Sequence, residues 1–182
     1  MRIAFSGTHR SGKSTLLGEI AGLLPHHVTV DEPYDLLEEE GYETTEMPSL
    51  EDFEAQLERS LLSFEEAGAN ALFDRCPADI LAYLLAHRDA AGFDADEWLE
   101  RVMRAMRTLD LVVYVPVESP DRIAVPATED RALRMAVDET LEELLLEDRY
   151  AFEVTVLRVH GALQDRARQV WQRIIVERGP IP

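Results

Sequence analysis

The sequence predicts an α/β fold, in which a parallel β-sheet carries helices on both of its faces. Three observations lead to this prediction. Short apolar runs typical of strands alternate along the chain with segments of helical periodicity. The segment 7–14, with the sequence GTHRSGKS, follows the first of these runs and precedes a helical pattern. Acidic residues follow other runs, at the strand ends where such sheets bind ligands.

Five strands are predicted from the apolar runs. The run 111–115 has the continuous apolar character that is expected where both faces of a strand are buried. The strands are predicted at residues 2–6, 27–31, 71–73, 111–115 and 152–159.

Helices are predicted where apolar residues recur at spacings of three and four. One follows Ser49, a predicted N-cap, and closes at Gly68. Another begins at Asp94, which is spaced from Glu97 as in a capping box. The others are predicted at residues 13–24, 77–87, 129–148 and from 163 onward.

Two segments lack a regular period. Residues 34–48 are rich in acids and turn formers, and we predict a loop with one helical turn there. Residues 116–128 contain several prolines and are too long for a simple connection. Long loops in compact domains often act as lids, so this segment is a candidate lid.

Composition limits the function. The chain has 182 residues, 46% of them hydrophobic, which predicts a single domain over residues 1–182 with an ordinary core. A formal net charge of −18 argues against a nucleic-acid partner and an anionic membrane surface. The lone Cys76 excludes an internal disulfide. The first strand starts at Arg2 and no apolar run is long enough to span a membrane, so we expect no signal peptide and a cytoplasmic location. The oligomeric state, with a homodimer as one option, stays open.

The glycine-rich segment is predicted to be a P-loop that holds a nucleoside triphosphate. Its glycines let the backbone wrap a phosphate chain, and the following helix adds the positive end of its dipole. Lys13, the one lysine of the chain, would reach the β- and γ-phosphates, and the Ser14 hydroxyl would bind Mg²⁺. The predicted nucleotide-binding residues are Gly7, His9, Arg10, Ser11, Gly12, Lys13, Ser14, Thr15 and Gly161. With the strand pattern, the motif predicts a three-layer, doubly wound sheet of the P-loop NTPase type.

Acidic residues follow the second and third predicted strands. Asp74 can hold Mg²⁺ opposite Ser14, while Arg75 can reach a transferring phosphate. The alternative for this pair is a surface ion pair that caps a helix. Glu32, before Pro33, can accept the proton of an acceptor hydroxyl or orient that group. The alternative for Glu32 is ordinary turn chemistry.

Arginines follow the fourth predicted strand, in the candidate lid at residues 117–134. Arg122 lies in the loop, and Arg131 and Arg134 share a helix face at i, i+3 spacing. On a lid, these arginines would neutralise charge on a transferring phosphoryl group. The alternative for Arg131 is an ion pair with the two acids before it. Gly161, after the last strand, is placed to line a nucleotide base or to form a tight turn.

Taken in chain order, these motifs resemble small P-loop kinases of the nucleoside-kinase-like and nicotinamide riboside kinase-like group, often described as AAA-type ATP-binding proteins. The resemblance rests on Gly7 to Thr15, Asp31-Glu32-Pro33, Asp74-Arg75, the arginine-bearing segment after the fourth strand, and Gly161. It implies a five-stranded parallel sheet in the order 2-3-1-4-5, an ATP or GTP donor with Mg²⁺, and phosphoryl transfer to a small molecule. Glu32 matches the acidic residue that faces the acceptor hydroxyl in deoxynucleoside kinases. Asp74-Arg75 matches their acidic–arginine pair after the third strand, although Cys76 stands where those kinases usually have serine.

The sequence therefore predicts a Mg²⁺-dependent kinase that phosphorylates a hydroxyl of a small molecule, with a nucleoside-like acceptor preferred. The predicted catalytic residues are Lys13, Glu32, Asp74, Arg75, Arg131 and Arg134. The acceptor-side segment, 32–108, offers Arg59 and Arg75 close to an acidic run, which favours an uncharged or cationic acceptor. The alternative is a nucleotide-binding switch or slow NTPase that acts on a protein partner. A second, acceptor-facing carboxylate favours the kinase, while the acceptor and the choice between ATP and GTP stay open.

Overall fold

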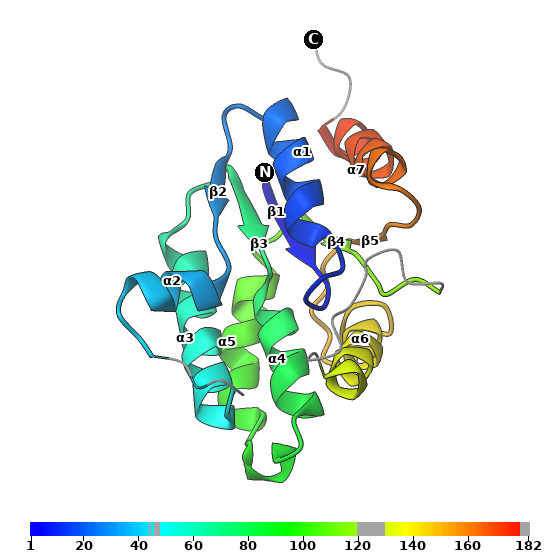
Figure 1. Ribbon diagram of the computed structural model, residues 1–182. Coiled ribbons are helices and arrows are strands. Elements are labelled where there is room, and N and C mark those ends of the chain that lie inside the picture. Colours follow the sequence, from blue (N-terminus) through cyan, green and yellow to red (C-terminus); the bar gives the residue numbers. More distant parts are fainter. Residues whose placement is uncertain (44, 46–47, 120–129, 179–182) are drawn as a thin grey trace.

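Five strands form one parallel sheet in the computed structural model, in the order β2-β3-β1-β4-β5 (Figure 1). The predicted α/β fold and strand order are therefore confirmed. The structure describes residues 1–43, 45, 48–119 and 130–178. The strands are β1 (Arg2–Ser6), β2 (Val28–Val30), β3 (Ala71–Asp74), β4 (Leu111–Tyr114) and β5 (Val156–Arg158).

The first strand lies at the centre of the sheet, because it pairs in parallel with β3 on one side and β4 on the other. Ile3, Ala4 and Phe5 are completely buried, as expected for a strand that is covered on both faces. Val28, on the edge strand β2, is 67% exposed. Since all strands run in the same direction, the segments that follow β1, β2 and β3 meet at one edge of the sheet.

Two helices cover one face of the sheet. α1 (Lys13–Leu23) and α7 (Leu163–Arg178) lie side by side there, as Figure 1 shows. Leu16 of α1 and Ile174 of α7 are completely buried in one apolar cluster with residues of the central strands. This packing fixes the direction of α1, which carries the end of the glycine-rich loop.

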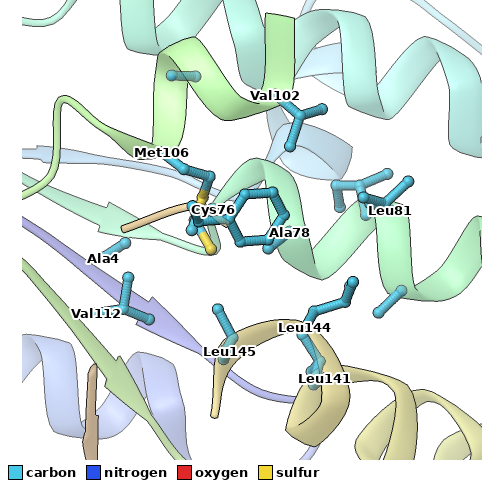
Figure 2. Packing of buried hydrophobic residues seen from close by; sticks show 14 of the residues in the cluster. Ala4, Cys76, Ala78, Leu81, Val102, Met106, Val112, Leu141, Leu144 and Leu145 are labelled. Carbon is cyan, nitrogen blue, oxygen red and sulfur yellow. The ribbon is translucent and has the colours of Figure 1, made fainter. Parts of the chain in front are cut away.

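Four helices cover the opposite face. They are α3 (Leu50–Glu66), α4 (Pro77–Ala86), α5 (Asp96–Met106) and α6 (Arg131–Leu145). Figure 2 shows side chains of α4, α5 and α6 closing around Ala4 and Val112 of the sheet. The helix residues labelled there are Ala78, Leu81, Val102, Met106, Leu141, Leu144 and Leu145. Residues 77–84 of α4 are all buried, because this helix packs against α3, α5 and α6.

The segment after β2 differs from its prediction. The helical turn predicted within residues 34–48 is present, but it is longer than one turn and begins at Pro33, as α2 (Pro33–Glu39). Pro33 begins the helix, where its fixed φ and missing N–H are tolerated. Pro33 and Leu37 are its buried residues, one turn apart, and they pack toward α3. A helix this short contains too few apolar residues to show a period in the sequence.

Other boundaries were predicted with mixed success. The prediction that a helix begins at Asp94 with a capping box to Glu97 is wrong. The helix α5 begins at Asp96, and the Asp94 side chain accepts a hydrogen bond from the Asp96 N–H at 3.0 Å. The predicted N-cap Ser49 is confirmed, with its hydroxyl accepting from the Asp52 N–H at 3.2 Å.

The last strand, β5, is shorter than predicted and begins only at Val156. Asp148, Ala151 and Glu153 have φ values of 51°, 53° and 58°, so the chain turns repeatedly before the strand. α6 correspondingly ends at Leu145, and η1 (Ala90–Gly92) is a single 3₁₀ turn between α4 and α5. Among the helices within the described ranges, none is both long and apolar enough to cross a membrane.

Candidate functional site

The glycine-rich loop joins β1 to α1 at the edge of the sheet where the strands end. Gly7 has a φ of 147°, and a Cβ atom there would lie 2.4 Å from the Val115 carbonyl oxygen. Gly12, with a φ of 89°, forms the N-cap of α1. Both positions therefore require glycine, as the P-loop prediction expects. Lys13 begins the helix and is buried, while Ser14 beside it is exposed.

The carboxylates predicted from the second and third strands converge on this lysine. Lys13 Nζ lies 2.6 Å from Glu32 Oε1 and 3.7 Å from Asp74 Oδ1. The strand order explains this convergence, because β2 and β3 both end beside the loop that follows β1. Residues that lie far apart in the sequence thus form one charged centre.

Arg75 completes the centre from the opposite side of Glu32. Its Nε donates to Glu32 Oε2 at 2.7 Å, and its Nη1 donates to the Gly7 carbonyl oxygen at 3.1 Å. Arg75 is only 7% exposed and has a φ of 79°, which is rare for a residue with a side chain. The surface ion pair considered as an alternative is therefore wrong, because this guanidinium is buried against the P-loop backbone.

The two carboxylates experience different electrostatic environments. Burial alone would raise the pKa of Glu32, but Arg75 and Lys13 outweigh it and lower the pKa to about 2. Burial raises the pKa of Asp74, and the nearby Lys13 offsets only part of that effect. Asp74 Oδ1 is buried and accepts no hydrogen bond within the described part of the chain. Glu32 is thus a stable anion, while Asp74 has an oxygen atom available for a ligand.

A cavity of about 270 Å³ opens beside Glu32, between the P-loop and the helices α2, α3, α4 and α6. Its lining residues are His9, Glu32, Tyr34, Pro48, Phe53, Gln56, Arg75, Ile80, Tyr83 and Leu133. Phe53 and Tyr83 stack with their ring centres 5.1 Å apart. The amide of Gln56 is nearly buried and makes no hydrogen bond within the described ranges. The cavity therefore offers aromatic surface, an amide and a carboxylate to a small ligand.

The predicted lid arginines occupy different environments. Arg134 is 4% exposed, and its Nε and Nη2 donate to the carbonyl oxygens of His9 and Arg10 at 3.2 and 3.4 Å. Arg131 lies exposed at the start of α6. Arg122 and most of the predicted lid lie outside the described residues. Arg134 therefore holds the P-loop itself and is not available on the surface.

A sequence profile of the AAA domain family matches residues 2–166. The chain belongs to the AAA domain family. No curated protein sequence matches it.

Solved structures share the fold of this AAA domain. The deoxyadenosine kinase from M. mycoides with bound dATP aligns with a TM-score of 0.64 and 16% identity, over 96% of this chain and 99% of that chain. The thymidylate kinase from Candida albicans aligns with a TM-score of 0.66 and 15% identity, over 97% and 92% of the two chains. The thymidylate kinase from Ehrlichia chaffeensis aligns with a TM-score of 0.67 and 14% identity, over 96% and 97%. At these identities the similarity establishes the fold.

Asp79 is a buried residue of this AAA domain that the sequence interpretation missed. Its Oδ1 accepts from the Gly7 N–H at 2.8 Å and from the Ser6 hydroxyl at 3.0 Å. Its Oδ2 accepts from the Cys76 N–H at 2.9 Å, which closes a capping box at the start of α4. The spacing of Cys76 and Asp79 could have indicated the cap, but the contacts with the P-loop depend on the fold.

A second missed group lies behind the P-loop of this AAA domain. Arg166 is 7% exposed, and its Nη1 donates to the Ser11 carbonyl oxygen at 2.8 Å. Its Nη2 lies 3.4 Å from Glu118 Oε1, which accepts from the Gly161 N–H at 2.6 Å. The predicted base-lining Gly161 is therefore tied to Glu118 and has a φ of 94°. No motif in the sequence marked Arg166 or Glu118.

Proposed function

We propose that the protein is a kinase that transfers the γ-phosphoryl group of ATP or GTP to a hydroxyl of a small, uncharged, nucleoside-like acceptor. The observation that carries this proposal is the position of Glu32. One oxygen of this carboxylate contacts Lys13 of the P-loop, and the same side chain lines the adjacent cavity. A kinase needs a carboxylate between the donor phosphates and an acceptor, whereas a simple nucleotide switch does not.

The donor would occupy the P-loop. Its phosphates would be bound by the loop backbone and by Lys13, and the N–H groups of Arg75 that do not hold Glu32 and the Gly7 carbonyl would approach the transferring group. The exposed Ser14 hydroxyl donates a hydrogen bond to Asp74, so these two oxygen-bearing side chains lie together and fit Mg²⁺, which is commonly held by one or two protein oxygens together with substrate phosphates. Bound there, the ion would neutralise charge on the phosphate oxygens.

Glu32 would act on the acceptor hydroxyl. Lys13 would turn from Glu32 toward the donor phosphates when they bind, which leaves Glu32 Oε1 free while Oε2 stays on Arg75. The freed oxygen would accept a hydrogen bond from the acceptor hydroxyl and orient its oxygen toward the γ-phosphorus. As the new P–O bond forms and the bond to the leaving diphosphate breaks, the hydroxyl proton passes to Glu32. Departure of Lys13 removes one of the charges that lower the Glu32 pKa, which makes the carboxylate a better base.

The charges around the cavity favour an acceptor without a phosphate group. Arg75 is already bound by Glu32 and the Gly7 carbonyl, and Arg134 is bound by P-loop carbonyls. Arg59 does not line the cavity and pairs with two glutamates. The phosphate of a nucleoside monophosphate would therefore be repelled by the ionised Glu32, with few cations to offset the repulsion. An uncharged nucleoside avoids this repulsion.

A substrate screen tests the proposal. Nucleosides, nucleoside monophosphates and amino-alcohols are each incubated with ATP or GTP and Mg²⁺. The rate of ADP or GDP release is compared with the rate in the absence of an acceptor. We expect a nucleoside to raise turnover, and Lys13→Ala to abolish the effect. If no small molecule raised turnover but a protein partner did, the protein would be a nucleotide-binding switch and not a kinase. If monophosphates were the best acceptors, the uncharged class would be wrong.

A further inference from the structure

His9, in the first half of the P-loop, is held from several directions. Its main-chain N–H donates to the Tyr83 hydroxyl at 3.1 Å, and its Nδ1 lies 2.8 Å from the same hydroxyl. Its carbonyl oxygen accepts from Arg134 Nε at 3.2 Å. The next residue, Arg10, has a φ of 54°, so the loop turns sharply here. The conformation of this part of the loop therefore depends on contacts from α4 and α6.

Tyr83 reaches the P-loop from the wall of the acceptor cavity. Its ring lines the cavity, stacks on Phe53 and lies 5.4 Å from the Arg75 guanidinium carbon. The side chain is 6% exposed, and burial raises the pKa of its hydroxyl, so Tyr83 keeps its proton at neutral pH. One side chain thus contacts the cavity with its ring and the P-loop with its hydroxyl.

We propose that Tyr83 is a positioning residue that acts through His9 and couples occupation of the acceptor cavity to donor binding. The proposal rests on the function proposed above, since it takes the cavity to be the acceptor site. An acceptor stacked in the cavity immobilises the Tyr83 ring, and the hydroxyl then holds the His9 backbone in the conformation that the donor requires. The first ligand to bind bears the entropic cost of ordering Tyr83 and the His9 backbone. The second ligand then binds a loop that is already ordered, so each ligand increases the affinity for the other.

This coupling needs Tyr83 to contact the cavity with its ring and the P-loop with its hydroxyl. Of these two groups, the hydroxyl can be removed without removing the other. Tyr83→Phe keeps the ring, its stacking on Phe53 and on the His9 ring, and the packing of α4, while it removes both hydrogen bonds with His9. Tyr42→Phe is the matched control, because it also removes one hydroxyl hydrogen bond, to Asp52 at 3.1 Å, away from the P-loop. The two variants therefore differ in the partner that is lost.

The experiment measures ATP affinity by calorimetry, with the non-hydrolysable β,γ-imido analogue standing for ATP so that no transfer occurs, first without acceptor and then with saturating nucleoside, using deoxyadenosine and thymidine as probes. Without acceptor, we expect Tyr83→Phe to weaken ATP binding about five- to thirtyfold, the size of one to two lost hydrogen bonds, and Tyr42→Phe to leave it unchanged. With a probe that the wild type turns over, we expect the nucleoside to tighten ATP binding at least fivefold in the wild type and not in Tyr83→Phe.

Unchanged ATP affinity and unchanged coupling in a folded Tyr83→Phe protein would overturn the proposal. An equal loss of ATP affinity in Tyr42→Phe would also overturn it, because the effect would then be general. If neither probe is turned over, the proposed function is in question, but ATP affinity without acceptor still decides whether the hydroxyl positions the loop. The double variant His9→Ala/Tyr83→Phe supplies a second measurement. If the two residues act as one unit, the double variant should bind ATP as tightly as the weaker-binding of the two single variants.

Discussion

The ammonium group of Lys13 lies 2.6 Å from Glu32 Oε1, so the lysine of the P-loop is held by a carboxylate that follows β2, two strands away from β1 in the sheet. The other oxygen of that carboxylate binds Arg75 at 2.7 Å. Glu32 thus bridges two cations, and a donor phosphate bound as proposed would compete with it for Lys13. The same residue can restrain donor binding and, once Lys13 has left, act on an acceptor.

Replacing Glu32 separates these two effects. Glu32→Gln keeps the size of the side chain but removes its charge, so we expect acceptor-dependent transfer to fall about 10²- to 10⁴-fold. ATP affinity should stay equal or increase, because a neutral amide competes less for Lys13. Turnover assays and calorimetry give both values, and Lys13→Ala, which should lose ATP binding, is the control. A variant with intact transfer would remove Glu32 from the acceptor side.

The pH dependence of stability should reveal the same carboxylate. The pKa of Glu32 in the folded protein is lowered to about 2, so between about pH 2 and 4.5 the unfolded chain binds more protons at this residue than the folded chain does. Glu32 therefore contributes stability above its ordinary pKa and loses it as the pH falls through 2. The contribution is on the order of 3 kcal/mol at neutral pH.

Urea unfolding of the wild type and of Glu32→Gln at pH 2, 4 and 6 measures this contribution. We expect the difference in unfolding free energy between the two proteins to be largest at pH 6 and to shrink toward pH 2. Comparing the two proteins at each pH cancels the other carboxylates. An equal difference at all three pH values would mean that Glu32 has an ordinary pKa in the folded protein.

Much of the charged centre could be predicted because parallel strands end at a common edge. Glu32 and Asp74 each follow a strand, and the strand order brings both to Lys13. The sequence could not predict Asp79 or Arg166, because these residues contact the P-loop through the packing of α4 and α7. Contacts between distant segments leave no local period or spacing in the chain.

The lid region marks a different limit of prediction. The i, i+3 spacing placed Arg131 and Arg134 on one helix face, but only Arg134 is buried. Which residues of an amphipathic helix contact a loop is decided by how the helix packs, and this is invisible in its spacing. The length of α2, predicted as a single turn, was underestimated for a related reason, because its few apolar residues cannot define a period.

Asp74, the proposed Mg²⁺-binding carboxylate, should lower the stability of the ligand-free protein. Burial raises its pKa in the folded state, so ionised Asp74 costs stability at neutral pH, and the cost disappears as the pH falls below the raised pKa. We expect Asp74→Asn to raise the melting temperature of the ligand-free protein at pH 7. Mg²⁺-dependent turnover should fall about 10²-fold, since one charged oxygen near the phosphates is lost. A less stable Asp74→Asn protein would contradict this account.

Two arginines of α6 should differ in what their removal affects. Arg134 binds the carbonyl oxygens of His9 and Arg10, so we expect Arg134→Ala to lower the unfolding free energy by about 1–3 kcal/mol and to weaken ATP binding. Arg131 is exposed, so Arg131→Ala should change stability by less than about 0.5 kcal/mol. If Arg131 reaches the transferring group, its loss lowers kcat about tenfold at unchanged ATP affinity. Full activity of Arg131→Ala would exclude it from the reaction.

Arg166, on α7, should support the P-loop from the side opposite the cavity beside Glu32. Its guanidinium joins the Ser11 carbonyl oxygen to Glu118, and Glu118 in turn holds the Gly161 N–H. Arg166→Ala removes this donor from the buried Ser11 carbonyl and this cation from Glu118. The loop should then sample conformations that do not bind phosphate, so we expect ATP affinity to fall about tenfold, with acceptor KM unchanged.

The neighbouring Arg168 offers a matched control on the same helix, because its side chain is 66% exposed and pairs only with Asp165 within the described ranges. Arg168→Ala should leave ATP affinity unchanged. Calorimetry with ATP, together with urea unfolding, separates two roles of Arg166. If Arg166→Ala lowered the unfolding free energy but bound ATP like the wild type, Arg166 would stabilise the fold without shaping the P-loop. A loss of ATP affinity in a protein that remains folded would instead place the Arg166–Glu118 pair among the groups that hold the donor site in its binding conformation.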